Sequence, residues 1–173
     1  MGIRSMRYVA IIGCASNWED DLNALRALVD EFDVIAVGLD CPYKEHVHYF
    51  ATYHTEDIKT YRHNRWRAAL NVNFKVISHV DRPELNISLV IPYKKPSGSS
   101  SLLAAFAAVH LKYDKVILCG CPLEGVNAKR YSYKAFRKGW TTYAPLLKGS
   151  VRSMSGWTKE FLGEPTREWL GVA

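Results

Sequence analysis

Apolar residues recur along the chain in short continuous runs that alternate with segments of helical periodicity. The first run, Tyr8–Ile12, precedes a segment, residues 18–32, with apolar residues at spacings of three and four. A second run over residues 33–39 is apolar on both faces, which is typical of a strand buried in a parallel sheet. Strand, tight glycine turn, helix and strand in this order predict a βαβ unit of the Rossmann type.

The alternation continues to about residue 125. Further strands are expected over residues 49–53, 74–78, 87–91 and 114–120, with 87–91 suited to an edge, and helices over 57–70 and 102–111. The second of these helices is apolar on all sides and is expected to be buried. The pattern predicts one α/β domain, a three-layer Rossmann-like sandwich with a mostly parallel sheet.

The C-terminal part of the chain, about residues 126–173, is basic and aromatic, and we interpret it as a lid or extension of the single domain. One short helix is expected within residues 150–163. The segment from Arg152 to Trp157 combines arginine with small polar residues, which favours a loop that contacts an anion. Arg152 is therefore a candidate for neutralising charge on a ligand. The basic stretch 129–152 is an alternative surface for nucleic acid.

Composition sets the broad class. The chain has 173 residues, of which 48% are hydrophobic and 23% charged, as expected of one globular domain with its own core. No apolar run approaches the ~20 residues that a membrane helix needs, so we expect a soluble cytoplasmic protein with no membrane partner. The net charge of +6 favours an anionic partner.

Cysteine spacing indicates reduced thiols, because the four cysteines show no zinc-finger pattern. Cys119 and Cys121 are two residues apart, and strand alternation would direct both side chains to the same face.

Candidate ligand-binding residues follow the strands. In open α/β sheets ligands bind outside the carboxyl ends of the strands. The residues that follow the predicted strands are Gly13, Ser16 and Asn17, then Asp40, then His54, then Gly120 and Glu124. The first turn lacks the full glycine pattern of dinucleotide-binding proteins, which argues against NAD and leaves a mononucleotide or sugar nucleotide.

A serine-rich turn precedes the buried helix. Gly98 permits close approach to the backbone, and Ser99 and Ser100 would present N–H groups at a helix start, where anions bind. Lys94 and Lys95 lie just upstream. His54, with acidic residues shortly after it, is a candidate general base, and a plain surface histidine is the alternative.

The stretch from Gly98 to Gly125, with its Ser/Gly turn, small-residue helix and Ile-Leu-Cys-Gly-Cys strand end, resembles two related groups of proteins. These are the 6-hydroxymethylpterin diphosphokinase-like proteins and the Rossmann-like bacterial sialyltransferases that use CMP-sialic acid. The turn after the first strand, Gly13 to Ser16 followed by Leu22, and Asp40 after the second strand are similar to their motifs. The resemblance covers about residues 8–125.

The resemblance implies nucleotide contacts for Gly13, Ser16, Asp40, Ser99 and Ser100, and a phosphate contact for Tyr131 or Tyr133. The diphosphokinase-like proteins bind a metal through acidic groups, which would make Asp40 and Glu124 the candidates here and Mg²⁺ the candidate cofactor. The sialyltransferases carry a catalytic histidine after those tyrosines, whereas no histidine follows His110 in this chain.

The sequence therefore favours a nucleotide-binding transferase that acts on a nucleotide-sugar or nucleoside-phosphate donor. In this hypothesis His54 is the base, and Tyr131 and Arg152 neutralise the leaving group. The alternatives are a non-catalytic protein that binds a nucleotide or metabolite, a nucleic-acid-binding protein, and a nucleotide hydrolase.

Overall fold

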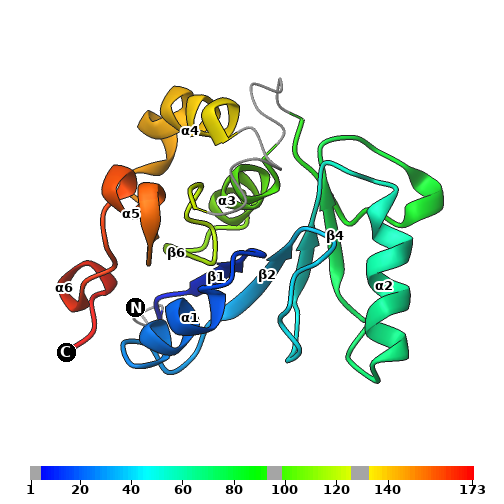
Figure 1. Ribbon diagram of the computed structural model, residues 1–173, viewed down its shortest axis with the longest axis horizontal. Coiled ribbons are helices and arrows are strands. Elements are labelled where there is room, and N and C mark those ends of the chain that lie inside the picture. Colours follow the sequence, from blue (N-terminus) through cyan, green and yellow to red (C-terminus); the bar gives the residue numbers. More distant parts are fainter. Residues whose placement is uncertain (1–4, 93–98, 126–132) are drawn as a thin grey trace.

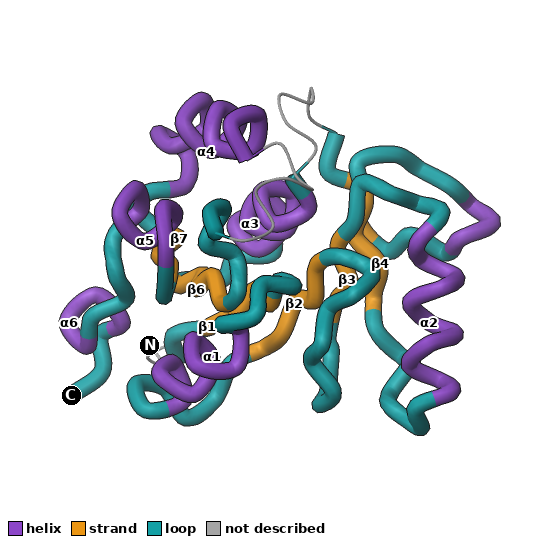
Figure 2. The backbone as a smooth tube through the Cα atoms, viewed as in Figure 1, coloured by secondary structure: helices purple, strands orange, loops and turns teal. Residues whose placement is uncertain are grey.

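The centre of the protein is a seven-stranded sheet in which every neighbouring pair of strands is parallel. The computed structural model describes residues 5–92, 99–125 and 133–173. The strands lie side by side in the order β5-β4-β3-β2-β1-β6-β7, and Figure 2 shows this order from β4 to β7. The strands are β1 (Tyr8–Ile12), β2 (Asp33–Val37), β3 (Tyr49–Ala51), β4 (Lys75–Ser78), β5 (Leu89–Val90), β6 (Lys115–Cys119) and β7 (Val151–Ser153).

Helices cover both faces of this sheet, as in the predicted three-layer Rossmann-like fold (Figure 1). They are α1 (Trp18–Arg26), α2 (Asp57–Arg67), α3 (Ser100–His110), α4 (Tyr133–Leu147), α5 (Gly156–Leu162) and α6 (Arg167–Leu170), with a 3₁₀ turn, η1 (Pro83–Leu85). Alternate residues of β1 serve the two cores. Val9 and Ile11 pack with α3 and α4, whereas Ala10 and Ile12 pack with α1 and α2.

Helix α3 is the buried helix that its uniform apolar sequence predicts. It packs across β1, β2, β3, β4 and β6, and all its residues from Ser101 to Ala105 are buried. The predicted edge strand is also confirmed, because β5 pairs only with β4 within the described residues.

The C-terminal segment differs from the prediction in one respect. Arg152 and Ser153, which we interpreted as part of an anion-contacting loop, belong to β7, which pairs with β6 through Val116 and Val151. Within the predicted lid or extension, the described residues also supply Trp140, Leu147 and Leu162 to the α3 side of the core. The C-terminal residues thus complete the sheet as well as covering it.

Two strands, β2 and β6, end at glycines and are therefore shorter than the apolar pattern suggests. Gly38 and Gly120 have φ of +86° and +63°, values that favour glycine and turn the chain out of the sheet. Because Gly120 breaks the strand alternation, Cys119 packs on the α1 side and Cys121 on the α3 side. The prediction of one shared face was therefore wrong, whereas all four cysteines are free, as expected.

None of the helices in the described residues is long and apolar enough to cross a bilayer.

Candidate functional site

The strand order reverses between β1 and β6. Strands β1 to β5 extend the sheet in one direction, and the chain then returns through α3 to place β6 on the other side of β1. Such a reversal separates the loops at the carboxyl ends of the two strands, which is where open α/β sheets bind ligands. The candidate site is therefore built from the turn after β1 and the loop after β6.

These two loops touch through glycine. The N–H of Gly13 donates to the carbonyl oxygen of Cys119 at 2.9 Å, and Ala15 donates to that of Gly120 at 3.2 Å. A Cβ atom at Gly13 would collide with the Gly120 carbonyl and lie 2.6 Å from the Cys121 sulfur. Gly13 and Gly120, both predicted as ligand-binding residues, thus hold the floor of the site together with backbone groups that are already paired.

A buried carboxylate connects the same loops. Oδ2 of Asp21, in the first turn of α1, accepts hydrogen bonds from Gly120 N at 2.8 Å, Ser155 Oγ at 2.6 Å and Asn17 Nδ2 at 3.3 Å. Asn17 also donates to Ser155 Oγ at 2.6 Å. Burial raises the pKa of Asp21, and the bonds from Ser155 and Gly120 oppose that rise. The cluster fixes the start of α1 to the ends of β6 and β7.

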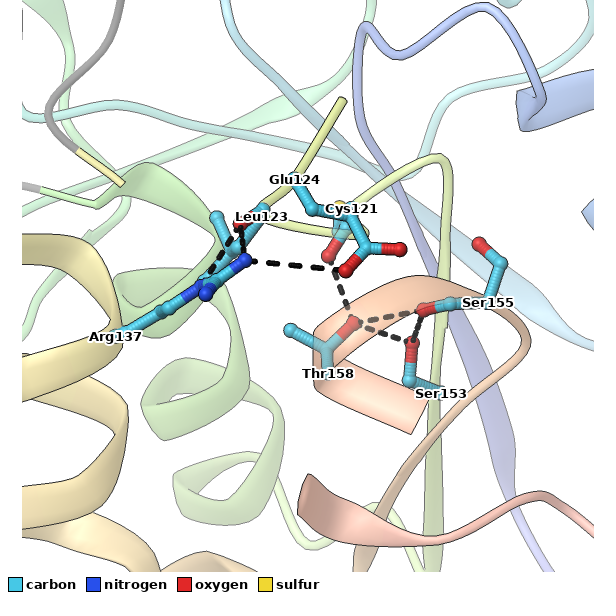
Figure 3. A network of polar contacts seen from close by, with 7 residues as sticks. All are labelled: Cys121, Leu123, Glu124, Arg137, Ser153, Ser155 and Thr158. Atoms are coloured by element: carbon cyan, nitrogen blue, oxygen red, sulfur yellow. Dashed lines mark hydrogen bonds and ion pairs between the residues drawn. The ribbon is translucent and has the colours of Figure 1, made fainter. Parts of the chain in front are cut away.

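Hydroxyl groups continue this network under α5 (Figure 3). Thr158 Oγ1, which is fully buried, lies 2.8 Å from Ser153 Oγ and donates to the carbonyl of Cys121 at 2.9 Å. The N–H of Thr158 also bonds to the carbonyl of Pro122 at 3.4 Å. The chain after β6 is therefore held in one conformation by side chains from β7 and α5.

The positively charged side chain of Arg137 lies beside the end of the loop after β6. Arg137, on α4, donates from Nε and Nη2 to the carbonyl of Leu123 at 3.1 and 2.9 Å, and Nη2 lies 3.8 Å from Glu124 Oε2 (Figure 3). Leu123 has φ of +52°, so the loop is in a conformation that its own side chain disfavours. Arg137 brings positive charge to the carboxyl edge of β6, beside the predicted ligand residue Glu124.

The serine-rich turn lies at the carboxyl edge, as we expected. Ser99 Oγ caps α3 by accepting from Leu102 N at 3.4 Å and lies 2.8 Å from Ser101 Oγ. Ser100 Oγ accepts from the N–H of Tyr53, just after β3. These hydroxyls therefore connect the helix to the sheet, while the first backbone N–H groups of α3 point out of the helix start. Gly98 lies outside the described residues.

His54 and Asp40 lie exposed after β3 and β2. His54 Nδ1 is 3.3 Å from Glu56 Oε1. The pKa of the Glu56 carboxyl is lowered, mainly by a hydrogen bond from the backbone of the same residue and further by His54. Burial raises the pKa of neighbouring Asp57, which senses the charges of His54 and Asp40. Three groups suited to holding a metal ion do not come together anywhere in the described ranges.

The side chain of Arg152, in the middle of β7, is directed to Leu162 and Trp169 and not to the loops that follow the strands. Its Nη1 donates to the carbonyl of Leu162 at 2.7 Å, and its guanidinium lies over the Trp169 ring at 5.6 Å. The structure thus assigns to it a contact between β7 and the last turn of α5. Tyr131 lies outside the described residues.

The basic, aromatic segment packs its aromatic residues inward. Tyr133, Phe136 and Tyr143 of α4 contact the α3 side of the core. Trp157 and Phe161 of α5 stack at 4.8 Å between centroids, with Arg137 over the first ring and Lys148 over the second. Both outer faces of this aromatic pair are therefore covered by cations of the same chain. Lys134 and Lys138 remain exposed on α4.

A cavity of about 820 Å³ lies at the opposite edge, around the first residues of β1 and β2. Among its charged side chains, Arg26 pairs with Glu45 at 2.6 Å and Asp33 contacts Tyr113 and His48, and Arg7, Asp30 and Glu31 also line it. Because this hollow lies at the amino ends of the strands, and open α/β sheets bind ligands at the carboxyl ends, we place the candidate site at the carboxyl edge.

Sequence reasoning missed four residues of the site: Asp21, Arg137, Ser155 and Thr158. Asp21 left a signal, because an acid four residues after Asn17 lies on the same side of the helix. Ser155 lies within the segment from Arg152 to Trp157 that we expected to contact an anion. Arg137 and Thr158 reach the site through folding of distant segments.

Comparison with family models, with curated proteins and with solved structures found no match for this chain. The resemblance to the diphosphokinase-like proteins and sialyltransferases remains a prediction, and the fold and the site geometry carry the functional argument.

Proposed function

We propose that the carboxyl edge of the sheet, from the loop after β6 and the turn after β1 across β2 to β3, binds a nucleotide or nucleotide-sugar and that the protein transfers a group from this donor to an acceptor. The observation that carries the proposal is the reversal of strand order at β1 and β6. It places two helix starts, those of α1 and α3, on opposite faces of the sheet at the edge where open α/β sheets bind ligands.

The two helix starts differ in charge, and this difference orients the donor. The first turn of α1 carries the exposed acids Glu19 and Asp20, which repel phosphate and suit the hydroxyl groups of a ribose. The first turn of α3 has no acidic residue, so its N–H groups suit a phosphate. Neighbouring strands are ~4.8 Å apart, so the edge from β1 to β3 spans roughly 10 Å for a ligand lying across β2.

The transfer step needs a base and a cation near the leaving group. His54, held by Glu56, is our candidate base for deprotonating an acceptor hydroxyl. Arg137 takes the role that the sequence suggested for Arg152, because it reaches the loop after β6 whereas Arg152 is directed to α5. The leaving nucleotide would depart with its charge offset by Arg137.

The test is a thermal-shift panel of nucleotides, nucleotide-sugars and pterins, with and without Mg²⁺, followed by an assay of nucleotide release. A true ligand at about 100 times its Kd raises the free energy of unfolding by roughly 2.7 kcal/mol, a readily visible shift. Ser16→Tyr, which places a ring in the exposed turn after β1, should abolish the shift. Asn73→Tyr, in an exposed position before β4, is the matched control and should retain it.

Transfer is separated from simple binding by His54→Ala. The variant should lose turnover while keeping nucleotide affinity, and release of nucleotide should depend on an added acceptor. Affinity without turnover in the wild type would instead favour the non-catalytic binding protein, and turnover with water alone would favour a hydrolase. A panel without any shift would overturn the site itself.

A further inference from the structure

Helix α2 carries a surface that the proposed nucleotide site does not use. Its outward residues Lys59, Arg62, His63, Trp66 and Arg67 follow the spacing i, i+3, i+4, i+7 and i+8, so they line one side of the helix. We refer to these five residues as the α2 outer face. Apolar residues at this spacing usually face the core, whereas these five residues are basic or aromatic and four of them are exposed.

Trp66 is the most conspicuous member of the α2 outer face, because its exposed fraction is 66%. The ring of His63 lies beside it, with centroids 5.9 Å apart and a tilt of 31° between planes. Lys59 and Arg67 are exposed, and Arg62 lies over the ring of Phe74 at 5.2 Å. The result is an aromatic shelf surrounded by cations.

The opposite side of α2 is fixed rigidly to the protein. Tyr61 stacks on Phe50 at 3.9 Å between centroids, and Ile58 is fully buried. Arg65 is also buried and donates to the carbonyl oxygens of Tyr43 at 2.9 Å, Glu45 at 2.7 Å and Asn71 at 2.8 Å. The fold thus uses this inner side, and the α2 outer face is held in place without contributing to the core.

Charge on the outer face has one sign. The only acidic residue of α2 is Asp57, at its first position, so the three cations of the outer face, Lys59, Arg62 and Arg67, have no compensating carboxylate beside them on the helix. In Figure 1, α2 lies at one end of the molecule and α4, α5 and α6 lie at the other. This face is therefore separate from residues 133–152, the described part of the basic segment that the sequence suggested.

We propose that the α2 outer face binds single-stranded nucleic acid, with Trp66 stacked on an unpaired base and Lys59, Arg62 and Arg67 beside the phosphates. Single strands expose both the bases and the phosphates, which is the combination that an aromatic shelf with cations recognises. A duplex keeps its bases stacked inside. A membrane-surface helix needs a broad apolar side, and this face offers one apolar residue.

Fluorescence anisotropy tests the proposal with fluorescein-labelled 12-mers of uridine and of thymidine, and a 12-bp duplex. The single strands should bind more tightly than the duplex. Three phosphate contacts predict a loss of roughly 20-fold in affinity between 50 and 200 mM salt. Preference for the uridine or the thymidine strand distinguishes RNA from DNA as the natural ligand.

Variants locate the site. Trp66→Ala should weaken binding between about 5- and 150-fold, with Trp66→Phe retaining most of the affinity. The pair Lys59→Gln and Arg67→Gln should lower the slope of log affinity against log salt by about 1.4. All these positions are exposed, so melting temperatures should stay close to that of the wild type.

Matched controls lie on α4. Leu146→Ala removes another highly exposed apolar side chain, and Lys134→Gln with Lys138→Gln removes two exposed cations. Neither should change single-strand affinity appreciably. Loss of affinity in these variants but not in Trp66→Ala would overturn the proposal in favour of the 129–152 surface. Equal or tighter binding to the duplex, or binding only to anionic phospholipid vesicles, would also overturn it.

These outcomes are independent of the proposed transferase, because Trp66→Ala should leave the nucleotide-induced thermal shift unchanged.

Discussion

Helices α2 and α4 both carry aromatic and basic residues at high density, but they place them differently. On α4 the aromatic residues point to the core, and the neighbouring pair Trp157 and Phe161 is closed on both sides by Arg137 and Lys148. On α2 the largest aromatic side chain, Trp66, projects into solvent. A basic, aromatic composition therefore does not identify a binding surface until the direction of each side chain is known.

Trp140 of α4 and Trp66 of α2 should differ most in how much their replacement by alanine lowers the free energy of unfolding. Trp140 of α4 is fully buried, so Trp140→Ala should lower the free energy of unfolding by about 3–5 kcal/mol. Trp66→Ala should change it by less than about 0.5 kcal/mol. Urea denaturation of both variants measures the contrast, and a costly Trp66→Ala would show that α2 uses its outer face for folding.

Arginine substitutions should give a smaller difference in the free energy of unfolding, and in the opposite direction. Here the buried side chain belongs to α2 and the partly exposed one to α4. Arg65 of α2 is buried and supports three backbone carbonyls, so Arg65→Gln should cost about 3 kcal/mol by leaving those groups unpaired. Arg137 of α4 supports one carbonyl and is partly exposed, so Arg137→Gln should cost about 1 kcal/mol.

The same urea titrations decide the arginine prediction. Arg62→Gln, on the outer face of α2, serves as the control for Arg65→Gln because it removes the same charge without uncovering carbonyls. Similar losses in Arg65→Gln and Arg62→Gln would mean that charge, and not hydrogen bonding, sets the effect.

Asp21 should give the smallest effect, visible as a pH dependence. Burial raises its pKa in the folded state, so the folded protein holds this proton where the unfolded chain has lost it. Its contribution to stability is therefore complete below the unfolded pKa and is lost as pH rises through the folded pKa.

Subtracting the Asp21→Asn curve from the wild-type curve isolates this contribution. The difference in free energy of unfolding should fall as the pH rises above about 4, the ordinary carboxyl pKa. Asp20→Asn removes the same charge at the exposed neighbouring position and is the control. A difference that rises with pH would contradict the raised pKa.

Local pattern was sufficient to predict most of the framework. The apolar runs gave β1 and β6 almost residue by residue, and the uniformly apolar sequence predicted the burial of α3. It failed for β7, because Val151–Ser153 is short and has a charged residue at its centre. That strand forms only because β6 offers it an edge.

The candidate site was less predictable, since its contacts join distant segments. The serine hydroxyls of 99–101 looked available for an anion, but the cap of α3 and the end of β3 occupy them. Asp21 occupies the first turn of α1, where acids commonly offset the helix dipole, yet Ser155, 134 residues away, makes it part of a buried network. Partners of this kind depend on the order of strands, which local periodicity does not encode.

The position of β1 also affects how the protein is synthesised. This strand pairs with β2, which follows it closely, and with β6, where Tyr8 lies opposite Lys115. A ribosome adding roughly 5–20 residues per second releases β6 several seconds after β1. During that interval the central strand of the future sheet has one unpaired edge, and such edges recruit other chains. The order of synthesis therefore leaves the β6 side of β1 uncovered until Lys115–Cys119 emerges.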